Sequence, residues 1–483
     1  MNAELARTFA AIQPPPAVVT DDERLRPFET DAFVSHRAVP MMAVLPDSAT
    51  QVGPVIAACA ARGVPLVTRG AGTGISGGAI PHPEGVLLVM TKMRTLLALD
   101  PLGRTATVEP GISNLAVSEA AAPHGLFYAP DPSSQMVCSI GGNVAENAGG
   151  VHCLKYGFTV HNILALVAYD GEGERIDLGS LALDAPGYDL IALMTGSEGN
   201  LGVVTEVTVK LIAQPAATQT LLAGFDSVRE AAEAVGEIIG AGLVPAALEM
   251  MDRVVIEACE RYMGLGLPKD SEALLLAEVD GGVEEADEAL AQVRAILERC
   301  GATEVRVARD DRERAELWRS RKGAFAALAT VRPDYYTIDG SIPRRALPDV
   351  LDQVYALSKA AGLLVGNVFH AGDGNIHPCI FYDSGVPGEL EKGEALGGRI
   401  LELCIEAGGT ITGEHGVGIE KLQQMCLQFR PAEITAFHDV KRAFDPAGIL
   451  NPGKAVPTLN RCSEWGGMRV RDGRVPRPDI PRF

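Results

Sequence analysis

The sequence predicts an α+β fold that is divided into more than one domain. Its 483 residues exceed what a single hydrophobic core usually serves. Hydrophobic residues make up 47% and charged residues 22%, so core material is ample and the chain is expected to fold. Strand-like and helix-like runs follow one another along the chain, and glycine-rich loops separate several of them.

The first half of the chain is expected to hold one α+β domain. Residues 1–46 should form a short opening helix, ended by the three prolines at 14–16, and a turn-rich strap. From residue 47 the pattern becomes regular and predicts a domain over 47–215. Its expected elements are a helix at 49–62 and strands at 64–69, 85–90, 105–108, 164–169 and 203–211.

The second half is expected to form a domain over 216–430, in which strands alternate with full helices. The expected strands are 220–225, 246–251, 273–279 and 303–308, and the expected helices are 227–241 and 283–300. This order predicts an antiparallel sheet covered on one face by helices, a ferredoxin-like domain. Residues 431–483 should contain a last helix at 431–444, which returns to the first domain, and an irregular tail after Pro457.

Charge and cysteine content exclude several classes of protein. The formal net charge of -20 repels nucleic acid, so no nucleic-acid partner is expected. The 9 cysteines are scattered and form no CxxC pair, which excludes a contiguous iron-sulfur or zinc-knuckle motif and favours reduced thiols. No apolar run is long enough to span a membrane, and no secretory signal region is seen. These features predict a cytoplasmic protein.

The first glycine loop matches GxGxxG through Gly72, Gly74 and Gly77, but its context differs from a dinucleotide-binding Rossmann loop. Such a loop opens directly into a helix, whereas here the prolines at 81 and 83 lead into another strand. Glycine backbone can still form an anion nest for a phosphate, with Arg69 at its entrance. The alternative is a tight turn without a ligand.

Two further glycine-rich regions follow at 130–157 and 195–211. Both combine small residues with side-chain amides, which permit close approach by a flat ligand and offer hydrogen bonds to it. Each region alone is also consistent with an ordinary loop between strands. Three such loops in one domain predict a single extended ligand that lies across them.

The motifs PLVTRGAGTGISGG, PDPSSQMVCSIGGNVAENAGG, KYG and GSEGNLGVVTEV resemble, in this order, the FAD-binding domain of the vanillyl-alcohol oxidase family. The resemblance implies a two-part FAD-binding domain, with the first loop on the pyrophosphate and the later loops on the isoalloxazine, ribose and adenine. No histidine lies within 69–78, so FAD is expected to bind without a covalent link. The implied FAD contacts are Arg69, Gly70, Ala71, Gly72, Thr73, Gly74, Gly77, Gly78, Pro130, Asp131, Ser139, Gly141, Gly142, Asn147, Gly149, Gly150, Gly157, Glu198, Gly202, Val204 and Asn451.

A second group of candidate residues lies near the C-terminus. In VFHAGDGNIHPCIFY, His370 and His377 flank a glycine turn, and in GGTITGEHGVGIEK, Glu414 and His415 are adjacent. Two histidines and a carboxylate make the three-ligand set of a catalytic metal site, which leaves the other histidine free to act as a base. The alternative is that these are ordinary polar residues of turns.

HAGDGNIH and GEHG resemble the 2-hydroxy-acid branch of the same family, which includes D-lactate dehydrogenases, D-2-hydroxyglutarate dehydrogenases and FAD-binding D subunits of glycolate oxidases. The resemblance implies that His370, His377 and Glu414 bind a divalent metal, usually zinc, and that His415 takes the hydroxyl proton. It also places the family's carboxylate-binding arginine at Arg321, in WRSRKGAF, and a cation there suits a substrate carboxylate.

The same resemblance narrows the range of expected substrates and partners. D-2-hydroxyglutarate enzymes carry a lysine and an asparagine where this chain has Thr337 and Cys379, which favours glycolate or D-lactate. Similarity to the glycolate oxidase D subunits runs from Arg26 to the closing NRCSEWGGMRVRDG. It implies a second flavin-binding subunit and an iron-sulfur subunit as partners, which would bring the chain to the inner membrane peripherally. A stand-alone D-lactate dehydrogenase, a non-catalytic flavin-binding subunit and a flavin-free metal hydrolase remain as alternatives.

Overall fold

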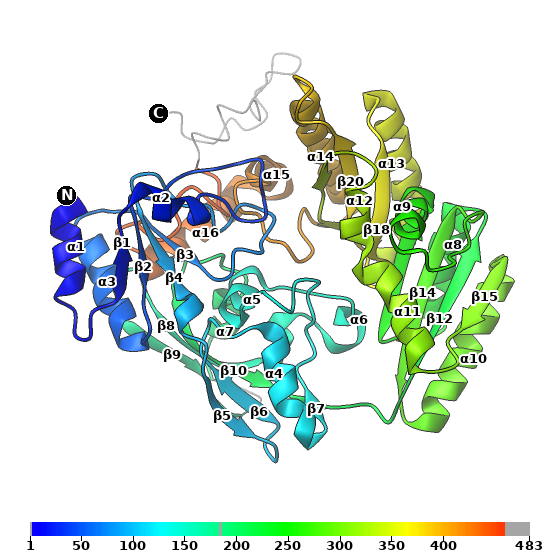
Figure 1. The fold of residues 1–483 in the computed structure, drawn as a ribbon, viewed down its shortest axis with the longest axis horizontal. Coiled ribbons are helices and arrows are strands. Elements are labelled where there is room, and N and C mark those ends of the chain that lie inside the picture. The colour runs from blue at the N-terminus through cyan, green and yellow to red at the C-terminus, as the bar shows by residue number, and fades with distance from the viewer. Residues whose placement is uncertain (1, 183–185, 459–483) are drawn as a thin grey trace. The chain divides into compact units, whose positions relative to one another are not determined.

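A computed structural model describes residues 2–182 and 186–458, and the chain forms two compact units that interleave in sequence (Figure 1). The first unit comprises Met1–Gly149, Gly157–Gln214 and Glu414–Phe483. The second comprises Gly150–Tyr156 and Pro215–Gly413. Most of the predicted tail, with NRCSEWGGMRVRDG and Cys462, lies outside the described residues.

The first unit begins with a four-stranded sheet of order β1-β2-β4-β3, in which β2, β4 and β3 are parallel. Two helices pack on it, because Phe9 and Ile56 share a buried core with Val44 and Leu88. The elements are α1 (Asn2–Ala10), β1 (Ala17–Val19), α2 (Asp22–Leu25), β2 (Met42–Leu45), α3 (Val52–Ala60), β3 (Leu66–Arg69) and β4 (Val86–Val89).

A second sheet in the same unit is antiparallel throughout, with the order β5-β6-β10-β8-β9. Its apolar face, which includes Val108 and Val207, packs against Val144 and Met194 of short helices and Phe444 of the last helix. The elements are β5 (Leu96–Asp100), β6 (Thr105–Val108), α4 (Asn114–Ala121), β7 (Leu126–Phe127), α5 (Ile140–Glu146), β8 (Ile163–Tyr169), β9 (Arg175–Gly179), α7 (Leu190–Met194), β10 (Val203–Lys210), β11 (Ile212–Ala213), α15 (Leu422–Gln428) and α16 (Pro431–Phe444).

The second unit is built on one antiparallel sheet of order β15-β12-β14-β13-β18-β19-β17, to which β20 and β16 are added beside β18. Its strands are β12 (Ala217–Phe225), β13 (Ala247–Asp252), β14 (Ala273–Gly281), β15 (Glu304–Val307), β16 (Asp334–Thr337), β17 (Gly340–Ser341), β18 (Val365–His370), β19 (Asn375–Ile376) and β20 (Pro378–Tyr382). Its helices are α6 (Cys153–Tyr156), α8 (Val228–Gly240), α9 (Arg253–Met263), α10 (Val283–Arg299), α11 (Asp311–Lys322), α12 (Ala324–Leu328), α13 (Leu347–Ala361) and α14 (Glu389–Glu406).

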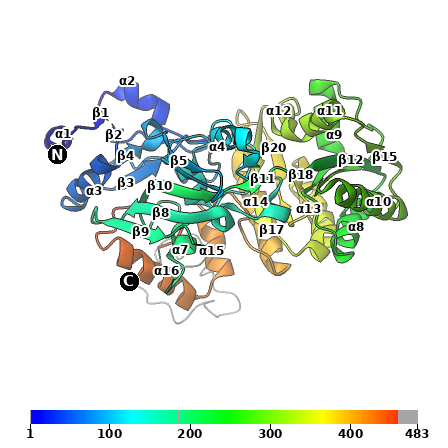
Figure 2. The same ribbon diagram turned by 90° about the horizontal axis from the view of Figure 1, so that it is seen from below.

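Helices cover both faces of this sheet, so the prediction of one covered face is wrong. Figure 2 shows α9, α11 and α12 on one side of the strands and α8, α10 and α13 on the other. The physical reason is visible in β14, where every position from Ala273 to Asp280 is buried, as happens only when both faces are covered. One face also carries the charged side chains of Glu249 and Glu278, which require partners from a helix above them.

Cysteine chemistry differs from the prediction at one position. Cys59, Cys138, Cys153, Cys259, Cys300, Cys379 and Cys404 are free, but Cys426 is disulfide-bonded. The prediction of reduced thiols is therefore wrong for Cys426, because the fold can pair cysteines that are scattered in sequence. Among the described residues, no helix has both the length and the apolar character needed to cross a membrane.

Candidate active site

The first glycine loop connects two parallel strands without a helix. β3 and β4 pair in register from Leu66 opposite Val86 to Arg69 opposite Val89, and residues 70–85, all described, form turns and bends. A Rossmann loop would place a helix here, so its exclusion is confirmed. Within the loop, Gly72 has a φ of 74°, a conformation that favours glycine.

The three glycine-rich regions meet within the first unit. A Cβ on Gly70 would collide with the Ser139 hydroxyl, which caps α5 by accepting a hydrogen bond from the Gly142 amide at 3.3 Å. The amide of Glu198 in the third region donates to the carbonyl of Ala145 at the end of α5, at 2.8 Å. These contacts join the residues expected to bind one ligand.

Asn451 is also part of this arrangement. Its side-chain amide donates to the Glu198 carbonyl at 2.6 Å and to the Gly78 carbonyl at 3.3 Å. Lys454, which the sequence reasoning missed, donates to the same Gly78 carbonyl at 2.8 Å and to the Ile80 carbonyl at 2.5 Å. Burial lowers the pKa of Lys454 to about 8, although nearby carboxylates favour its charged form.

Several predicted FAD contacts lie at the ends of the three glycine-rich regions or just outside them. Gly202 and Val204 lie at the start of β10, and Gly150 belongs to the segment that groups with the second unit. Gly157 follows α6 with a φ of 79°. The remaining predicted FAD contacts lie in the three loops or in α5, and these are Ala71, Thr73, Gly74, Gly77, Pro130, Asp131, Gly141, Asn147 and Gly149.

Unpaired polar atoms in these loops and in the adjoining β3 and α5 fit an extended polar cofactor. Thr68 Oγ1, Asn143 Nδ2, Thr195 Oγ1 and Asn451 Oδ1 are buried without a hydrogen-bond partner among the described residues. Buried polar atoms are rarely left unpaired in a complete protein. Glycine backbone beside such atoms provides both the space and the hydrogen bonds that FAD needs.

The GEHG loop is fastened to the first unit by three further contacts. The Ser76 hydroxyl donates to the His415 carbonyl at 2.8 Å. The Glu198 carboxylate accepts from the amides of Val417 and Gly418 at 2.7 and 2.6 Å. These bonds fix the backbone at His415 and directly after it against the first and third glycine loops.

Glu414 lies beside the second glycine region of the same unit. A Cβ on Gly149 would come within 2.5 Å of its Oε2 atom, so the Glu414 side chain lies directly against this glycine. The Glu414 carboxylate and the His415 ring approach to 3.6 Å. Glu414 and His415 are thus placed against residues expected to contact FAD.

In the second unit, Glu249 joins two predicted site residues. Glu249 on β13 and His370 on β18 are opposite one another in the sheet. The Glu249 carboxylate accepts from Arg321 Nε at 2.7 Å and lies 2.9 Å from His370 Nδ1. Burial alone raises the pKa of Glu249, but His370 and Arg321 outweigh it, so the pKa lies below the usual range. Both side chains of the Arg321–Glu249 pair are 1% exposed.

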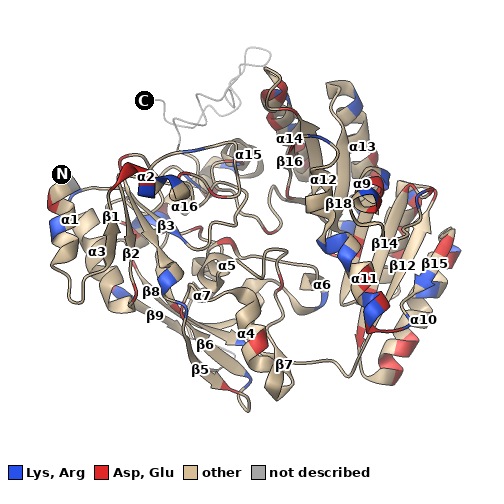
Figure 3. Ribbon diagram, viewed as in Figure 1, with Lys and Arg blue, Asp and Glu red and all other residues tan. Residues whose placement is uncertain are grey.

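Arg321 comes from the face of α11 that covers the sheet. Arg314, Trp318 and Arg321 lie four and three residues apart, so they share one side of this helix. Figure 3 shows that α11 carries both basic and acidic positions. Trp318 and Arg321 are buried, and the Nη2 atom of Arg321 has no hydrogen-bond partner among the described residues. A buried guanidinium with a nitrogen that still has a hydrogen to donate is suited to an anionic ligand.

The two predicted histidines lie together near this arginine. The His370 and His377 rings are 5.2 Å apart between centroids. The Phe325 ring is close to both sides of this cluster, at 6.0 Å from Arg321 Cζ and 6.5 Å from the His377 ring. The second unit therefore brings Arg321, His370 and His377 into one buried cluster.

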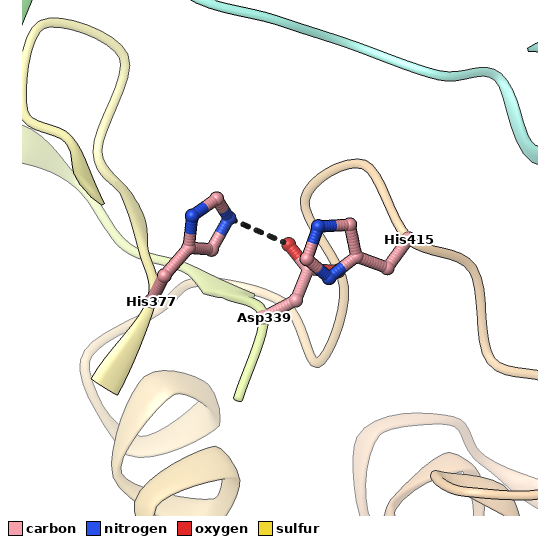
Figure 4. A group of neighbouring side chains, drawn as sticks. All are labelled: Asp339, His377 and His415. Carbon is pink, nitrogen blue, oxygen red and sulfur yellow. Dashed lines mark ion pairs between the residues drawn. The ribbon is translucent and has the colours of Figure 1, made fainter. Parts of the chain in front are cut away.

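Asp339 was missed in the sequence and links His377 to the end of the second unit. Figure 4 shows the His377 ring directed at the Asp339 carboxylate, at 3.6 Å, and its Nε2 atom also lies 3.1 Å from Asn375 Oδ1. Asp339 accepts a hydrogen bond from the Gly413 amide at 3.0 Å. Asp339 thus contacts both His377 and the last residue of the second unit, Gly413.

A weak sequence signal existed for both missed acids. Glu249 and Asp339 each interrupt an apolar stretch, in AALEMMD and TIDGSIP, and both are buried. Buried acids seldom occur without a partner.

Thr337 and Cys379, the uncharged residues that favour a small substrate, are paired across β16 and β20, with Oγ1 and Sγ 3.6 Å apart.

Comparison with known proteins shows the family. Residues 40–179 match the FAD binding domain, and residues 214–455 match the C-terminal domain of FAD linked oxidases. Glycolate oxidase subunit GlcD of Escherichia coli K12 is 55% identical over 466 residues, 96% of this chain and 93% of that protein. D-lactate dehydrogenase of Anaerostipes hadrus is 31% identical over 94% of this chain and 97% of its own length.

A solved structure of p-cresol methylhydroxylase with substrate bound has the same fold, with a TM-score of 0.80 and 17% identity, over 95% of this chain and 97% of that one. The predicted vanillyl-alcohol-oxidase-type FAD-binding domain and α+β second domain are confirmed. The chain therefore belongs to the FAD-linked oxidase family, in the group of FAD-dependent hydroxy-acid oxidoreductases that includes glycolate oxidase subunit GlcD and the D-lactate dehydrogenases.

Proposed function

We propose that the chain oxidises glycolate, and D-lactate as a second substrate, to the corresponding 2-oxo acid. The observation that carries this proposal is the buried Arg321 near His370 and His377, because its Nη2 atom has no hydrogen-bond partner within the described part of the chain. A short 2-hydroxy acid has a carboxylate for the arginine and a hydroxyl one carbon away for the histidine cluster. The glycolate oxidase relative supports the same substrate class.

FAD would be held by the glycine-rich regions of the first unit, including Arg69, Ser139, Glu198 and Asn451. When bound, FAD supplies the acceptor for the hydride that leaves C2 of the substrate. The chain's own contribution is to present backbone amides and side-chain amides around the cofactor. The buried unpaired atoms at Thr68, Asn143, Thr195 and Asn451 support this assignment.

His370, His377 and Glu414 would hold a divalent metal, which we propose to be zinc. A metal in such a site supplies Lewis acidity that makes the substrate hydroxyl easier to deprotonate. The imidazole of His415 would take the hydroxyl proton, while Arg321 would hold the carboxylate and orient C2. The donor set supports the proposal, because two imidazoles and one carboxylate suit zinc and leave a position for substrate.

The substrate is proposed to be a monocarboxylate. Thr337 and Cys379 are uncharged and bond to one another, so they offer no cation to a second carboxylate. A dicarboxylate would have to bury its distal charge without a partner there, which is costly. D-lactate differs from glycolate by one methyl group, a difference that hydrophobic pockets discriminate only weakly.

We further propose that the chain works in the cytoplasm with a second flavin-binding subunit and an iron-sulfur subunit, which would carry electrons towards the inner membrane. The glycolate oxidase relatives are themselves subunits by name, which supports a complex. A stand-alone D-lactate dehydrogenase is the second candidate, and the relative from Anaerostipes hadrus supports it.

The proposal is tested by mixing the purified, FAD-loaded chain anaerobically with glycolate, D-lactate, L-lactate or D-2-hydroxyglutarate. We expect the visible flavin absorbance to bleach with glycolate and D-lactate and to persist with the dicarboxylate. Bleaching by D-2-hydroxyglutarate alone would contradict the substrate assignment. No bleaching by any of the acids, with zinc supplied, would contradict catalysis by this chain alone.

A further inference from the structure

We propose that Glu249 is a positioning residue, whose one carboxylate orients both the Arg321 side chain and the His370 ring for their roles. The proposal deepens the proposed function and rests on the metal and substrate roles given there to His370 and Arg321. Glu249 lies on β13, the strand beside β18, and has no expected contact with substrate or metal. It acts through the two residues it holds.

The geometry allows very little freedom to the three side chains. Glu249 accepts from Arg321 Nε at 2.7 Å, and its two oxygens lie 2.9 and 3.0 Å from His370 Nδ1. The exposed fractions are 1% for Glu249 and Arg321 and 4% for His370. Such buried, charge-assisted contacts fix the rotamers of both partners.

Glu249 determines which nitrogen of His370 can bind a metal. A carboxylate beside a buried arginine is ionised and can only accept hydrogen bonds, so Nδ1 must carry the hydrogen. In the neutral ring, Nε2 then keeps its lone pair. A carboxylate that holds the far nitrogen of a ligand histidine orients the ring and makes it a stronger ligand.

The same carboxylate fixes the direction of the Arg321 nitrogen that is left for substrate. It uses Nε, whereas Nη2 is buried without a partner among the described residues. The guanidinium is planar, so fixing Nε also fixes the direction of its outer edge. Glu249 thereby orients the nitrogen that is available to a substrate carboxylate. Its negative charge also offsets the positive charge of the Arg321 guanidinium before substrate binds.

The test variant is Glu249→Gln, which preserves size but removes the second acceptor. A glutamine has one carbonyl oxygen, so either Arg321 or His370 would face its amide donor. If His370 accepts from that amide through Nδ1, its Nε2 carries a hydrogen and cannot bind a metal. If Arg321 faces it, the guanidinium loses its fixed direction.

Glu278→Gln is the matched control, because Glu278 is an equally buried acid on the same face of the sheet. Its exposed fraction is 1%, and Arg314 of α11 donates to it twice at 2.8 Å. Trp318 also donates to it, at 2.5 Å. Glu278→Gln therefore removes a buried acid from its pair with a partly exposed arginine of the same helix, and it does not touch Arg321 or His370.

The measurements are zinc affinity by equilibrium dialysis with metal analysis, the KM for glycolate, and the thermal unfolding midpoint of each FAD-loaded variant. We expect Glu249→Gln to weaken zinc binding by about 10- to 100-fold, as loss of such outer partners does elsewhere. Its KM should also rise, whereas Glu278→Gln should retain both values. Equal zinc affinity and equal KM in wild type and Glu249→Gln would overturn the inference. A wild-type chain that binds no zinc would instead overturn the proposed metal site and, with it, the role of Glu249 at His370.

Discussion

The Ser76 hydroxyl donates a hydrogen bond of 2.8 Å to the backbone carbonyl of His415. This bond ties the proposed base to the first glycine loop, which is expected to hold FAD. The backbone carbonyl of Ser76 also accepts from the amides of Ile419 and Glu420, and those bonds do not depend on the side chain. Substitution at Ser76 therefore isolates the contact to His415.

We expect Ser76→Ala to lower the rate of flavin reduction by glycolate about fivefold, because a lost hydrogen bond of about 1 kcal/mol lets the His415 backbone shift. The FAD content should be unchanged. Ser118→Ala is the control, since the Ser118 hydroxyl likewise donates to a backbone carbonyl, that of Tyr128, at 3.2 Å. An equal loss of rate in both variants would argue against a specific effect at His415.

His415→Asn should abolish proton transfer while it leaves FAD bound. Asparagine is close in size and can hydrogen bond, but it does not act as a base near neutral pH. The contribution of a general base is about 100- to 10,000-fold, so flavin reduction in a single turnover should slow by that range. Stopped-flow absorbance provides the rate and the cofactor content together. A rate close to wild type would remove His415 from the role of base.

Arg321→Lys should raise the KM for glycolate about 10- to 100-fold, although the positive charge is retained. Lysine lacks the planar fork, so it cannot bond to Glu249 through one edge and present another to the substrate. The control is Arg314→Lys on the same helix, where Arg314 pairs with Glu278. Steady-state kinetics of the two variants provide the comparison, and an unchanged KM in Arg321→Lys would show that the carboxylate binds elsewhere.

The regular elements were predictable from periodicity, because their apolar positions repeat in sequence. The last helix occupies 431–444 as predicted, and the helices expected at 227–241 and 283–300 differ by a residue or so at either end. The strands β5 and β9 were not predicted, since both are largely exposed and lack a buried alternation. Burial of the second unit's sheet on both faces was signalled by apolar runs such as Ala273–Ala277 in β14, which do not alternate with polar residues.

Site residues were predictable from the sequence where they share a short motif. They were not predictable where strand pairing brings distant residues together. His370 and His377 stand in one motif, as do Glu414 and His415. Glu249 lies 121 residues from His370 in sequence and contacts it only because β13 and β18 are neighbours. Local patterns do not contain such pairings, so the residue that unites Arg321 with His370 emerged only from the fold.

Gly74→Ala should weaken FAD binding without disturbing the protein around it. A Cβ at Gly74 meets no described protein atom within 4 Å, and its φ is not in the left-handed region. Any loss of affinity therefore reports contact with the cofactor, and we expect about tenfold, or about 1.4 kcal/mol. FAD titration by fluorescence provides the constant. Gly236→Ala in α8, which also has open space, is the control, and equal FAD affinity in all three proteins would place the cofactor away from Gly74.

Lys454 should make stability rise with pH between about 8 and 10.5. Its pKa is lowered from 10.5 to about 8, chiefly by burial, so the unfolded chain binds more protons than the folded chain in this window. Stability rises with pH wherever the unfolded state holds more protons. The energetic cost of burying the charged ammonium is thus fully present below pH 8 and is relieved as the pH approaches 10.5.

The corresponding measurement is the free energy of unfolding of wild type and Lys454→Met by denaturant titration at several pH values from 7 to 10, with the FAD-free chain. Other buried groups titrate in both proteins, so the difference between them isolates Lys454. We expect that difference to change by about 2 kcal/mol in favour of wild type as the pH rises across this range, since each unit of pKa shift corresponds to about 1.4 kcal/mol. Parallel pH profiles would show that Lys454 keeps an ordinary pKa, and its bonds to the Gly78 and Ile80 carbonyls would then be those of a solvated ammonium.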